Sequence, residues 1–345
     1  MYPSIPFRMA LARRRGTKGF TFFVFVISSA FLAAYCFIFY EKWSPDFKID
    51  QTGRQKPFER QTIRREKLPR VLILTLLHNS EKKLPHYFEL VNGLSYPKEL
   101  ISLVLGEDNS KDDTRMVAEQ GVKDLKGFWR AEFRHLEPLE GKHKGWGTEH
   151  HSKHYKNIQY QRRRHLALAR NLLMSHALYD EEYVLWLDSD VMEFPKDLIE
   201  QLLQPDKDII VPNCLIRYVG NVVLPYDLSS WRETQASLAY QASKKPDYLF
   251  LEGHNQKRPK RTYLNDLKRE GKLVKLDGAG SCVILIKAIH FRTGLNYPSF
   301  VFMNQIESEG LARVAAAMDL RIWGLPFLEV FHACDFESAH WTCPQ

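Results

Sequence analysis

Short, uninterrupted apolar runs recur along the chain from residue 71 onward, and each has the length of a strand. Such runs are typical of strands that are buried on both faces of a mostly parallel sheet. The runs are Val71–Leu77 (VLILTLL), Ile101–Leu105, Tyr183–Leu187 (YVLWL), Ile209–Val211 and Cys282–Ile286.

Two helical patterns separate the early runs, at Pro85–Leu94 and Arg162–Leu178. In the second, small and apolar residues recur at helical spacing and form a stripe that can face a sheet. The alternation predicts an α/β fold with a Rossmann-like, doubly wound sheet flanked by helices, in one domain over residues 71–345. In such sheets ligands collect beyond the carboxyl ends of the strands, so chemistry is expected there.

A longer apolar segment of 21 residues, Phe20–Tyr40, carries no charge and can span a bilayer core of about 30 Å. A cleaved signal peptide would have a shorter apolar region of about 7 to 15 residues, and a buried core helix is the other alternative. Basic residues without any acid precede the segment, so the positive-inside rule places residues 1–19 in the cytoplasm. The sequence therefore predicts a single-pass type II signal anchor, a polar stem at residues 41–70 and a lumenal domain.

The net charge of +8 is concentrated at this end of the chain. Residues 1–40 carry +5 and residues 41–70 carry +4, so the remainder is −1. Binding of nucleic acid would need a basic face across the folded domain, and no nucleic-acid partner is expected. A composition of 44% hydrophobic and 26% charged residues also excludes a disordered or low-complexity chain.

Five cysteines are too few for a disulfide scaffold. Cys36 lies in the predicted anchor, and the other four fall in a compartment that permits disulfides. The sequence leaves open how these four pair: Cys214, Cys282, Cys334 and Cys343.

Two carboxylates, Asp188 and Asp190, follow the apolar run Tyr183–Leu187. Charges at the end of a buried strand require compensation. Carboxylate oxygens suit Mg²⁺ or Mn²⁺, and the same ion can hold a diphosphate. We therefore predict a divalent metal site here, with a solvated turn as the alternative.

Further charged residues lie near this motif or after another strand. Asp108 directly follows a predicted strand and is a second site candidate, whereas residues 112–114 can cap the next helix. Arg163 and Arg170 are seven residues apart on one helix face, where guanidinium groups can pair with phosphate. A solvated basic face is the alternative for residues 162–164.

Histidines occur in two settings. Four of them crowd residues 143–154 among glycines and lysines. No cysteine or regular ligand pair accompanies them, so a polar loop at the mouth of a site is favoured over zinc. His332 ends the apolar run Phe327–Phe331, and a histidine in such a place is more often packed than a ligand.

Together these motifs resemble the fungal Golgi α-mannosyltransferases that include the mannan polymerase subunits, glycosyltransferase family 62. The resemblance covers about three quarters of the chain, from about Leu68 to His332, and is distributed over several segments. They are ILTLLHNSEKKLPHYFELVNGLSYPKELISLVLGEDNSKDDT, RRRHLALARNLL, YVLWLDSDV, DIIVPN, PYDLSSW, LDGAGSCVILIKA, IESEGLARVAAAM and WGLPFLEVFH.

The resemblance implies a GT-A fold, GDP-mannose as donor, Mn²⁺ (or Mg²⁺) as cofactor and a mannose-containing glycan as acceptor. It also implies a Golgi membrane location, retention of configuration and paralogous mannosyltransferase subunits as partners in a complex. The implied site residues are Asp188, Asp190 and His332 for the metal; Thr75, Asp108, Arg170 and Asp188 for the donor nucleotide; and Asp227 and Glu307 for catalysis near the sugar and acceptor.

The chain departs from the family in two places. Leu76 and His78 stand where the family usually has a proline and a basic residue, and residues 242–275 look family-variable, so nucleotide placement and acceptor contacts stay open. Two alternatives also remain: a non-catalytic GT-A subunit that stabilises a catalytic paralogue, and a GT-A enzyme for a UDP-sugar. The linkage formed, processivity and oligomeric state are not predicted.

Overall fold

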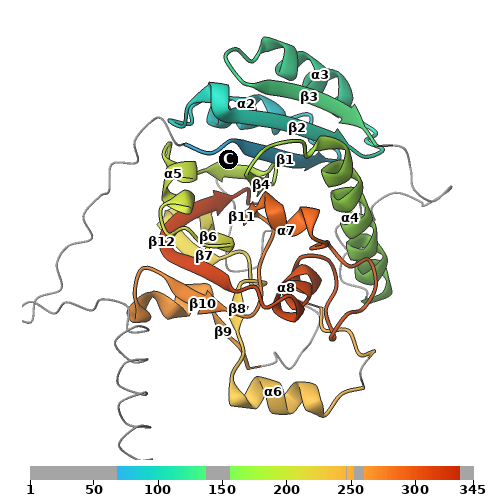
Figure 1. Cartoon of the computed structure of the whole chain (residues 1–345), viewed down its shortest axis with the longest axis vertical. Coiled ribbons are helices and arrows are strands. Elements are labelled where there is room, and N and C mark those ends of the chain that lie inside the picture. Colours follow the sequence, from blue (N-terminus) through green and yellow to red (C-terminus); the bar gives the residue numbers. More distant parts are fainter. Residues whose placement is uncertain (1–67, 137–155, 246, 252–259, 335–345) are drawn as a thin grey trace, which may run out of the picture. The chain divides into compact units, whose positions relative to one another are not determined.

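The computed structural model describes residues 68–136, 156–245, 247–251 and 260–334 (Figure 1). The predicted tail, the anchor at residues 20–40, most of the stem and the four histidines at 143–154 lie outside these ranges. Among the helices within them, none combines the length and the apolar character needed to cross a membrane. The membrane topology therefore stays a prediction.

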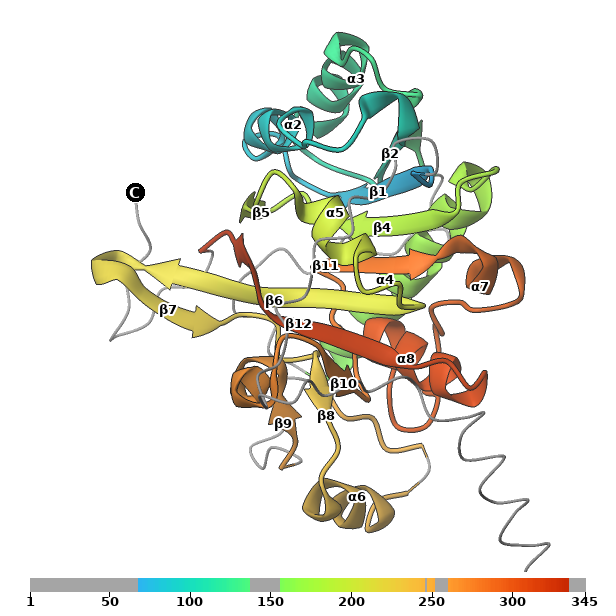
Figure 2. The same cartoon turned by 60° about the vertical axis from the view of Figure 1, so that its left-hand side comes forward.

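The described residues form a central sheet of ten strands (Figures 1 and 2). The strands are β1 Val71–Leu77, β2 Ile101–Glu107, β3 Arg130–His135, β4 Tyr183–Leu187, β5 Val191–Glu193, β6 Ile209–Tyr218, β7 Val222–Pro225, β10 Val274–Leu276, β11 Val283–Lys287 and β12 Ile322–His332. The main order is β10-β12-β6-β11-β4-β1-β2-β3, while β5 pairs with β12 and β7 with β6. A separate small sheet joins β8, Trp231–Arg232, to β9, Thr262–Tyr263.

All five predicted runs lie in or overlap strands of this sheet, but the sheet is mixed. Strand β1 is parallel to β2 and β4, and β6 is parallel to β12. Strand β11 is antiparallel to both of its neighbours, β4 and β6. The expectation of a mostly parallel sheet was therefore wrong, because an apolar run indicates burial on both faces and carries no information about strand direction.

Helices cover both faces of the sheet. Along β1, Val71 and Ile73 belong to the core on one face and Leu72 and Leu74 to the core on the other, as the pleat requires. This burial on both sides explains the unbroken apolar run. The helices are α2 Leu84–Asn92, α3 Thr114–Asp124, α4 Lys156–Ala177, α5 Leu198–Leu203, α6 Gln235–Ala242, α7 Ala288–Arg292 and α8 Glu307–Ala317.

Several strands end at the same edge of the sheet. The carboxyl ends of β1, β2 and β4 meet there because these strands are parallel neighbours. The short strand β5 pairs with the end of β12 and sets Val191 opposite His332. This pairing brings His332 beside the turn that contains Asp188 and Asp190.

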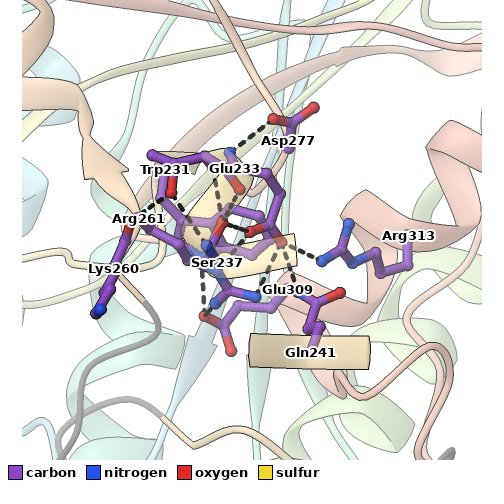
Figure 3. Close-up of polar contacts among 10 residues, drawn as sticks. Trp231, Glu233, Ser237, Gln241, Lys260, Arg261, Asp277, Glu309 and Arg313 are labelled. Carbon is purple, nitrogen blue, oxygen red and sulfur yellow. Dashed lines mark hydrogen bonds and ion pairs between the residues drawn. The ribbon is translucent and has the colours of Figure 1, made fainter. Parts of the chain in front are cut away.

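A buried polar network joins the part of the chain around β8 and α6 to helix α8 (Figure 3). Its centre is Glu233, which accepts hydrogen bonds from Arg261 at 3.2 Å, from Ser237 and from Arg313 of α8. Burial alone would raise the pKa of Glu233, but Arg261, Ser237 and Arg313 outweigh it and hold the pKa below its usual range. Glu309, whose Oε1 lies 4.0 Å from Arg261 Nη1, adds a second carboxylate. Two carboxylates and two guanidinium groups therefore balance their charges in a place largely withheld from water.

Replacing Glu233 by Gln should lower the free energy of unfolding by about 3 kcal/mol at neutral pH, because it leaves buried arginine charge uncompensated. A carboxylate whose pKa is depressed by folding stabilises the protein above its unfolded pKa, about 4.3, and this contribution is lost as the pH falls through the folded pKa. The difference in the free energy of unfolding between wild type and Glu233→Gln should therefore become smaller as the pH falls from about 5 to about 3. Urea unfolding at each pH measures this difference.

The matched control is Glu270→Gln, since Glu270 pairs with Arg232 at the surface at 2.8 Å. An exposed pair of this kind contributes at most about 1 kcal/mol. A destabilisation by Glu233→Gln that is the same at both ends of the pH range would contradict the assignment.

Candidate functional site

A cavity of about 690 Å³ lies at the carboxyl ends of the strands. Its walls come from the loops after β1, β4 and β7, from α4, from the start of α8 and from the end of β12. The charged side chains that line it are Lys83, Arg162, Arg163, Arg170, Asp188, Asp190, Asp227, Glu307 and His332.

Asp190 is held between a histidine and a lysine. Its Oδ1 lies 2.8 Å from His332 Nε2, and its Oδ2 lies 3.5 Å from Lys83 Nζ. Burial alone would raise the pKa of Asp190, but His332 and then Lys83 lower it, so the carboxylate is ionised at neutral pH. The ring of Tyr226 stacks on His332 with 3.7 Å between the centroids and covers one face of the imidazole.

Asp188, the other carboxylate of the motif, faces Arg170. Arg170 Nη2 lies 3.3 Å from Asp188 Oδ1, while its Nε donates to Glu307 Oε1 at 3.0 Å. Partial burial raises the pKa of Asp188; Arg170 opposes the rise and Asp190 adds to it. One guanidinium therefore serves two carboxylates in the cavity wall.

Arg170 is fixed from behind by two aromatic rings. Its Cζ lies 4.8 Å from the ring centroid of Trp186 and 5.5 Å from that of Tyr297. The next residue of α4, Asn171, makes two hydrogen bonds to the backbone of Tyr297. Its Nδ2 donates to the carbonyl at 2.7 Å, and its Oδ1 accepts from the N–H at 2.9 Å. Consecutive residues of α4 thus place both the arginine and one of the rings that it contacts.

The donor set at the end of β4 suits a divalent cation. Asp188, Asp190 and His332 all line the cavity, and a cation would relieve the repulsion between two neighbouring carboxylates. Across the described part of the chain, no three His, Cys, Asp or Glu side chains are already arranged as a coordination shell. The residues fit the predicted metal in their chemistry, while the coordination itself stays a prediction.

Glu307 enters the cavity from a turn of unusual backbone. It begins α8 with φ of 56°, and Met303 and Asn304 before it also have positive φ, a left-handed conformation that is uncommon for residues other than glycine. Burial alone would raise the pKa of Glu307, but Arg170 and Arg163 outweigh it and hold the pKa below its usual range. The turn therefore presents an ionised carboxylate to the cavity.

Asp227 lines the cavity just after β7. Its Oδ1 accepts a hydrogen bond from the backbone N–H of Ser229 at 2.8 Å. Its other oxygen rests on the backbone of Gly280, where an added Cβ would lie only 1.3 Å from Oδ2. The space for this carboxylate depends on the glycine.

Thr75 and Asp108, both predicted to hold the nucleotide, are not among the described residues that line the cavity. The hydroxyl of Thr75 is buried. It donates a hydrogen bond to the carbonyl of Leu187 at 2.7 Å and is hydrogen-bonded to the Tyr87 hydroxyl at 2.6 Å. Asp108 is buried and pairs with His165 of α4. In the structure both residues connect elements around the site.

Sequence reasoning missed several polar residues of the cavity wall, among them Lys83, Tyr226 and Ser281. Ser281 accepts a hydrogen bond from Arg170 Nη2 at 3.0 Å. Lys83 lies in the segment after β1, Tyr226 directly follows β7, and Ser281 lies two residues before β11. Their closeness to a strand end in the sequence was the signal that could have identified them.

Two of the predicted lumenal cysteines, Cys214 and Cys282, are free and buried, and Cys334 is disulfide-bonded. The free cysteines serve the site through their backbones. The carbonyl of Cys282 accepts from the N–H of Asp188 at 2.9 Å, and that of Cys214 accepts from the N–H of Asp227 at 3.3 Å.

Comparison with known proteins shows that the chain is similar to mannan polymerase subunits. A family profile described as Anp1 matches residues 53–301. The chain is 33% identical over 271 residues to the mannan polymerase complex subunit mnn9 of Schizosaccharomyces pombe, covering 76% of this chain and 79% of that protein. It is 32% identical over 275 residues to the mannan polymerase complex subunit MNN9 of Candida albicans, covering 76% and 74%. The predicted resemblance is confirmed.

A solved structure supports the fold. The crystal structure of GalNAc-T7 with UDP, GalNAc and Mn²⁺ matches with a TM-score of 0.53 at 16% identity, over 79% of this chain and 44% of that one. At this identity the likeness shows the fold alone, which is the predicted GT-A type in a mixed α/β form.

Replacing Gly280 by Ala should displace the Asp227 carboxylate. A methyl group 1.3 Å from Oδ2 cannot coexist with it, and ordinary contact at about 3.5 Å requires a shift of roughly 2 Å. A crystal structure of the variant tests this expectation. An Asp227 side chain in its original position would contradict it, and Gly93→Ala, whose nearest neighbour would lie at 3.2 Å, is the control for the same exchange in a less crowded place.

Proposed function

The chain belongs to the Anp1 family, and on this premise we propose that it is a mannosyltransferase that transfers mannose from GDP-mannose to a mannose of a glycan, with retention of configuration. The observation that carries the proposal is the presence of Asp188, Asp190, His332 and Arg170 at one cavity beyond the strand ends, where open α/β sheets bind ligands. The names of its relatives, subunits of mannan polymerase complexes, support mannose as the sugar.

The diphosphate of the donor would lie against cationic side chains of the cavity. Lys83, Arg163 and Arg170 line it, and guanidinium groups donate paired hydrogen bonds to phosphate oxygens. Burial alone would lower the pKa of Arg170, but Asp188 and Glu307 raise it, so the guanidinium stays charged. A fixed positive charge favours departure of the diphosphate.

The metal enters the proposal through three side chains. Asp188, Asp190 and His332 would hold Mn²⁺ or Mg²⁺, which when bound neutralises negative charge on the leaving diphosphate. Lys83 and His332 keep Asp190 ionised and thereby ready to act as a ligand.

Two carboxylates would act on the sugar and the acceptor. Glu307, ionised beside Arg163 and Arg170, can stabilise the positive charge that develops at the mannosyl carbon. Asp227, supported by Ser229, can accept the hydrogen bond of the attacking hydroxyl. Neither is assigned as a covalent nucleophile.

We place this activity in the Golgi lumen, on a type II membrane protein with paralogous subunits as partners. The apolar segment at residues 20–40 and the basic residues before it support the orientation. Two alternatives remain. One is a non-catalytic subunit, which the names of the relatives as complex subunits favour, and the other is an enzyme for a UDP-sugar.

Replacing Asp190 by Asn or His332 by Ala should lower mannose transfer by about two orders of magnitude, because each removes a proposed metal ligand. The assay is Mn²⁺-dependent transfer from GDP-mannose to mannose oligosaccharides. Asp180→Asn, a change of a largely exposed carboxylate paired with Arg70, is the matched control and should leave transfer unchanged. Full activity in either site variant would refute the assigned role, and a wild-type protein without turnover would favour the non-catalytic subunit.

The nucleotide can be identified by thermal unfolding. A ligand that binds only the folded protein stabilises it by about 2.7 kcal/mol at one hundred times its dissociation constant. GDP with Mn²⁺ should therefore raise the melting temperature of wild type, and UDP should not. The rise should lose its Mn²⁺-dependent part in Asp190→Asn, whereas stabilisation by UDP instead of GDP would overturn the choice of donor.

A further inference from the structure

The two carboxylates proposed for catalysis lie on segments that one buried hydrogen bond joins. The indole Nε1 of Trp231 donates to Glu309 Oε1 at 3.1 Å, and both side chains are almost completely buried. Trp231 follows Asp227 after one tight turn of chain, and Glu309 follows Glu307 by two residues. The bond therefore connects, behind the cavity, the two walls that carry Asp227 and Glu307.

The segment from Asp227 to Trp231 is fixed along its length. Ser230 Oγ accepts a hydrogen bond from the N–H of Gly280 at 3.1 Å, and the carbonyl of Trp231 accepts from the N–H of Gly278 at 2.9 Å. A displacement of Trp231 would therefore be transmitted to Asp227, which itself rests on Gly280.

The indole is confined on its faces. The guanidinium of Arg261 lies over it, with Cζ 3.5 Å from the ring centroid. A Cβ added at Gly278 would lie 2.3 Å from an indole atom, so the glycine backbone packs directly on the ring. The direction of the N–H toward Glu309 is set by these contacts.

Glu309 anchors the other wall. When the amide of Gln305 is oriented with its nitrogen toward Glu309, that nitrogen donates to Oε2 at 2.9 Å, and the amide oxygen accepts from Arg261 at 2.8 Å. These bonds flank the turn at residues 303–307, in which Met303, Asn304 and Glu307 have positive φ although none of them is glycine. Backbone of this kind costs about 1 to 3 kcal/mol per residue and persists only where its surroundings hold it.

We propose that Trp231 and Glu309 are positioning residues whose hydrogen bond sets the separation of Asp227 and Glu307. Neither is among the described residues that line the cavity, so they act through the two carboxylates and not on the ligand. The inference rests on the proposed function, which gives those carboxylates the sugar and the acceptor. Loss of this hydrogen bond should leave the affinity for the nucleotide unchanged, because Arg170 is also held in place by Trp186 and Tyr297.

The test is Trp231→Phe in the full chain, which keeps a ring and removes the N–H. With GDP-mannose, Mn²⁺ and an α-linked mannobiose as acceptor, kcat should fall by about 10- to 100-fold, since misplacement of reacting groups by about 1 Å has effects of this size. The Kd of GDP with Mn²⁺, measured by calorimetry, should stay within about twofold. Arg232→Gln, on the same strand and partly exposed, is the matched control and should leave both quantities unchanged.

A second pair of variants keeps the test decisive if Trp231→Phe does not fold. Glu309→Gln retains a carbonyl oxygen that can accept the indole N–H and should keep most of the wild-type kcat, while Glu309→Leu should lose it as Trp231→Phe does. A kcat of Trp231→Phe within about twofold of wild type, a parallel loss of kcat and GDP affinity, or equal damage by Gln and Leu at position 309 would overturn the proposal.

Failure of the positioning role can be told apart from failure of the proposed function, because the latter would show as a wild-type protein that does not turn over GDP-mannose. Hydrogen exchange of the backbone tests the positioning bond even without turnover. In Trp231→Phe, exchange should become faster both at residues 226–232 and at residues 303–310. Faster exchange in only one of these segments would show that the bond does not couple the two walls.

Discussion

Negative charge gathered at one edge of the sheet, partly withheld from bulk water, is the constraint around which the rest of the site is arranged. Carboxylates in such a place need partners, and the structure supplies a different kind to each. Asp188 and Glu307 share the guanidinium of Arg170, Asp190 has a histidine and a lysine, and Asp227 has a backbone N–H and a glycine that leaves it room. Arg170, Glu307 and His332 come from α4, α8 and β12. These elements are separated in sequence and converge only because the sheet places their ends together.

Much of this edge could be predicted from the sequence. Buried strands read as apolar runs, and polar residues directly after such a run must lie at the strand end, which located Asp188 and Asp190. The arginine at position 170 was recognisable because it lies seven residues after Arg163, on the same face of a predicted helix. His332 was different, because the sequence pattern alone favoured a packed histidine. Its place beside Asp190 follows from the pairing of β12 with β5. Strand β5 has only three residues and is too short to be recognised in the sequence.

The remainder depends on contacts that local pattern does not encode. The direction of β11 is decided by its neighbours, not by its composition. Thr75 has the position in the sequence of a site residue, yet its hydroxyl turns to Tyr87 and the end of β4. The ion network around Glu233 joins partners 28 and 80 residues away, and nothing in the sequence near Glu233 indicates that either arginine will meet it.

Under the proposed function, the sharing of Arg170 between Asp188 and Glu307 has a consequence for turnover. A phosphate group that docks on this guanidinium gains only part of its charge, because two internal carboxylates already draw on it. Tight retention of the spent nucleotide would slow every cycle, since strong ground-state binding does not accelerate chemistry. An arginine whose charge is partly neutralised by two carboxylates therefore favours release of the nucleotide product.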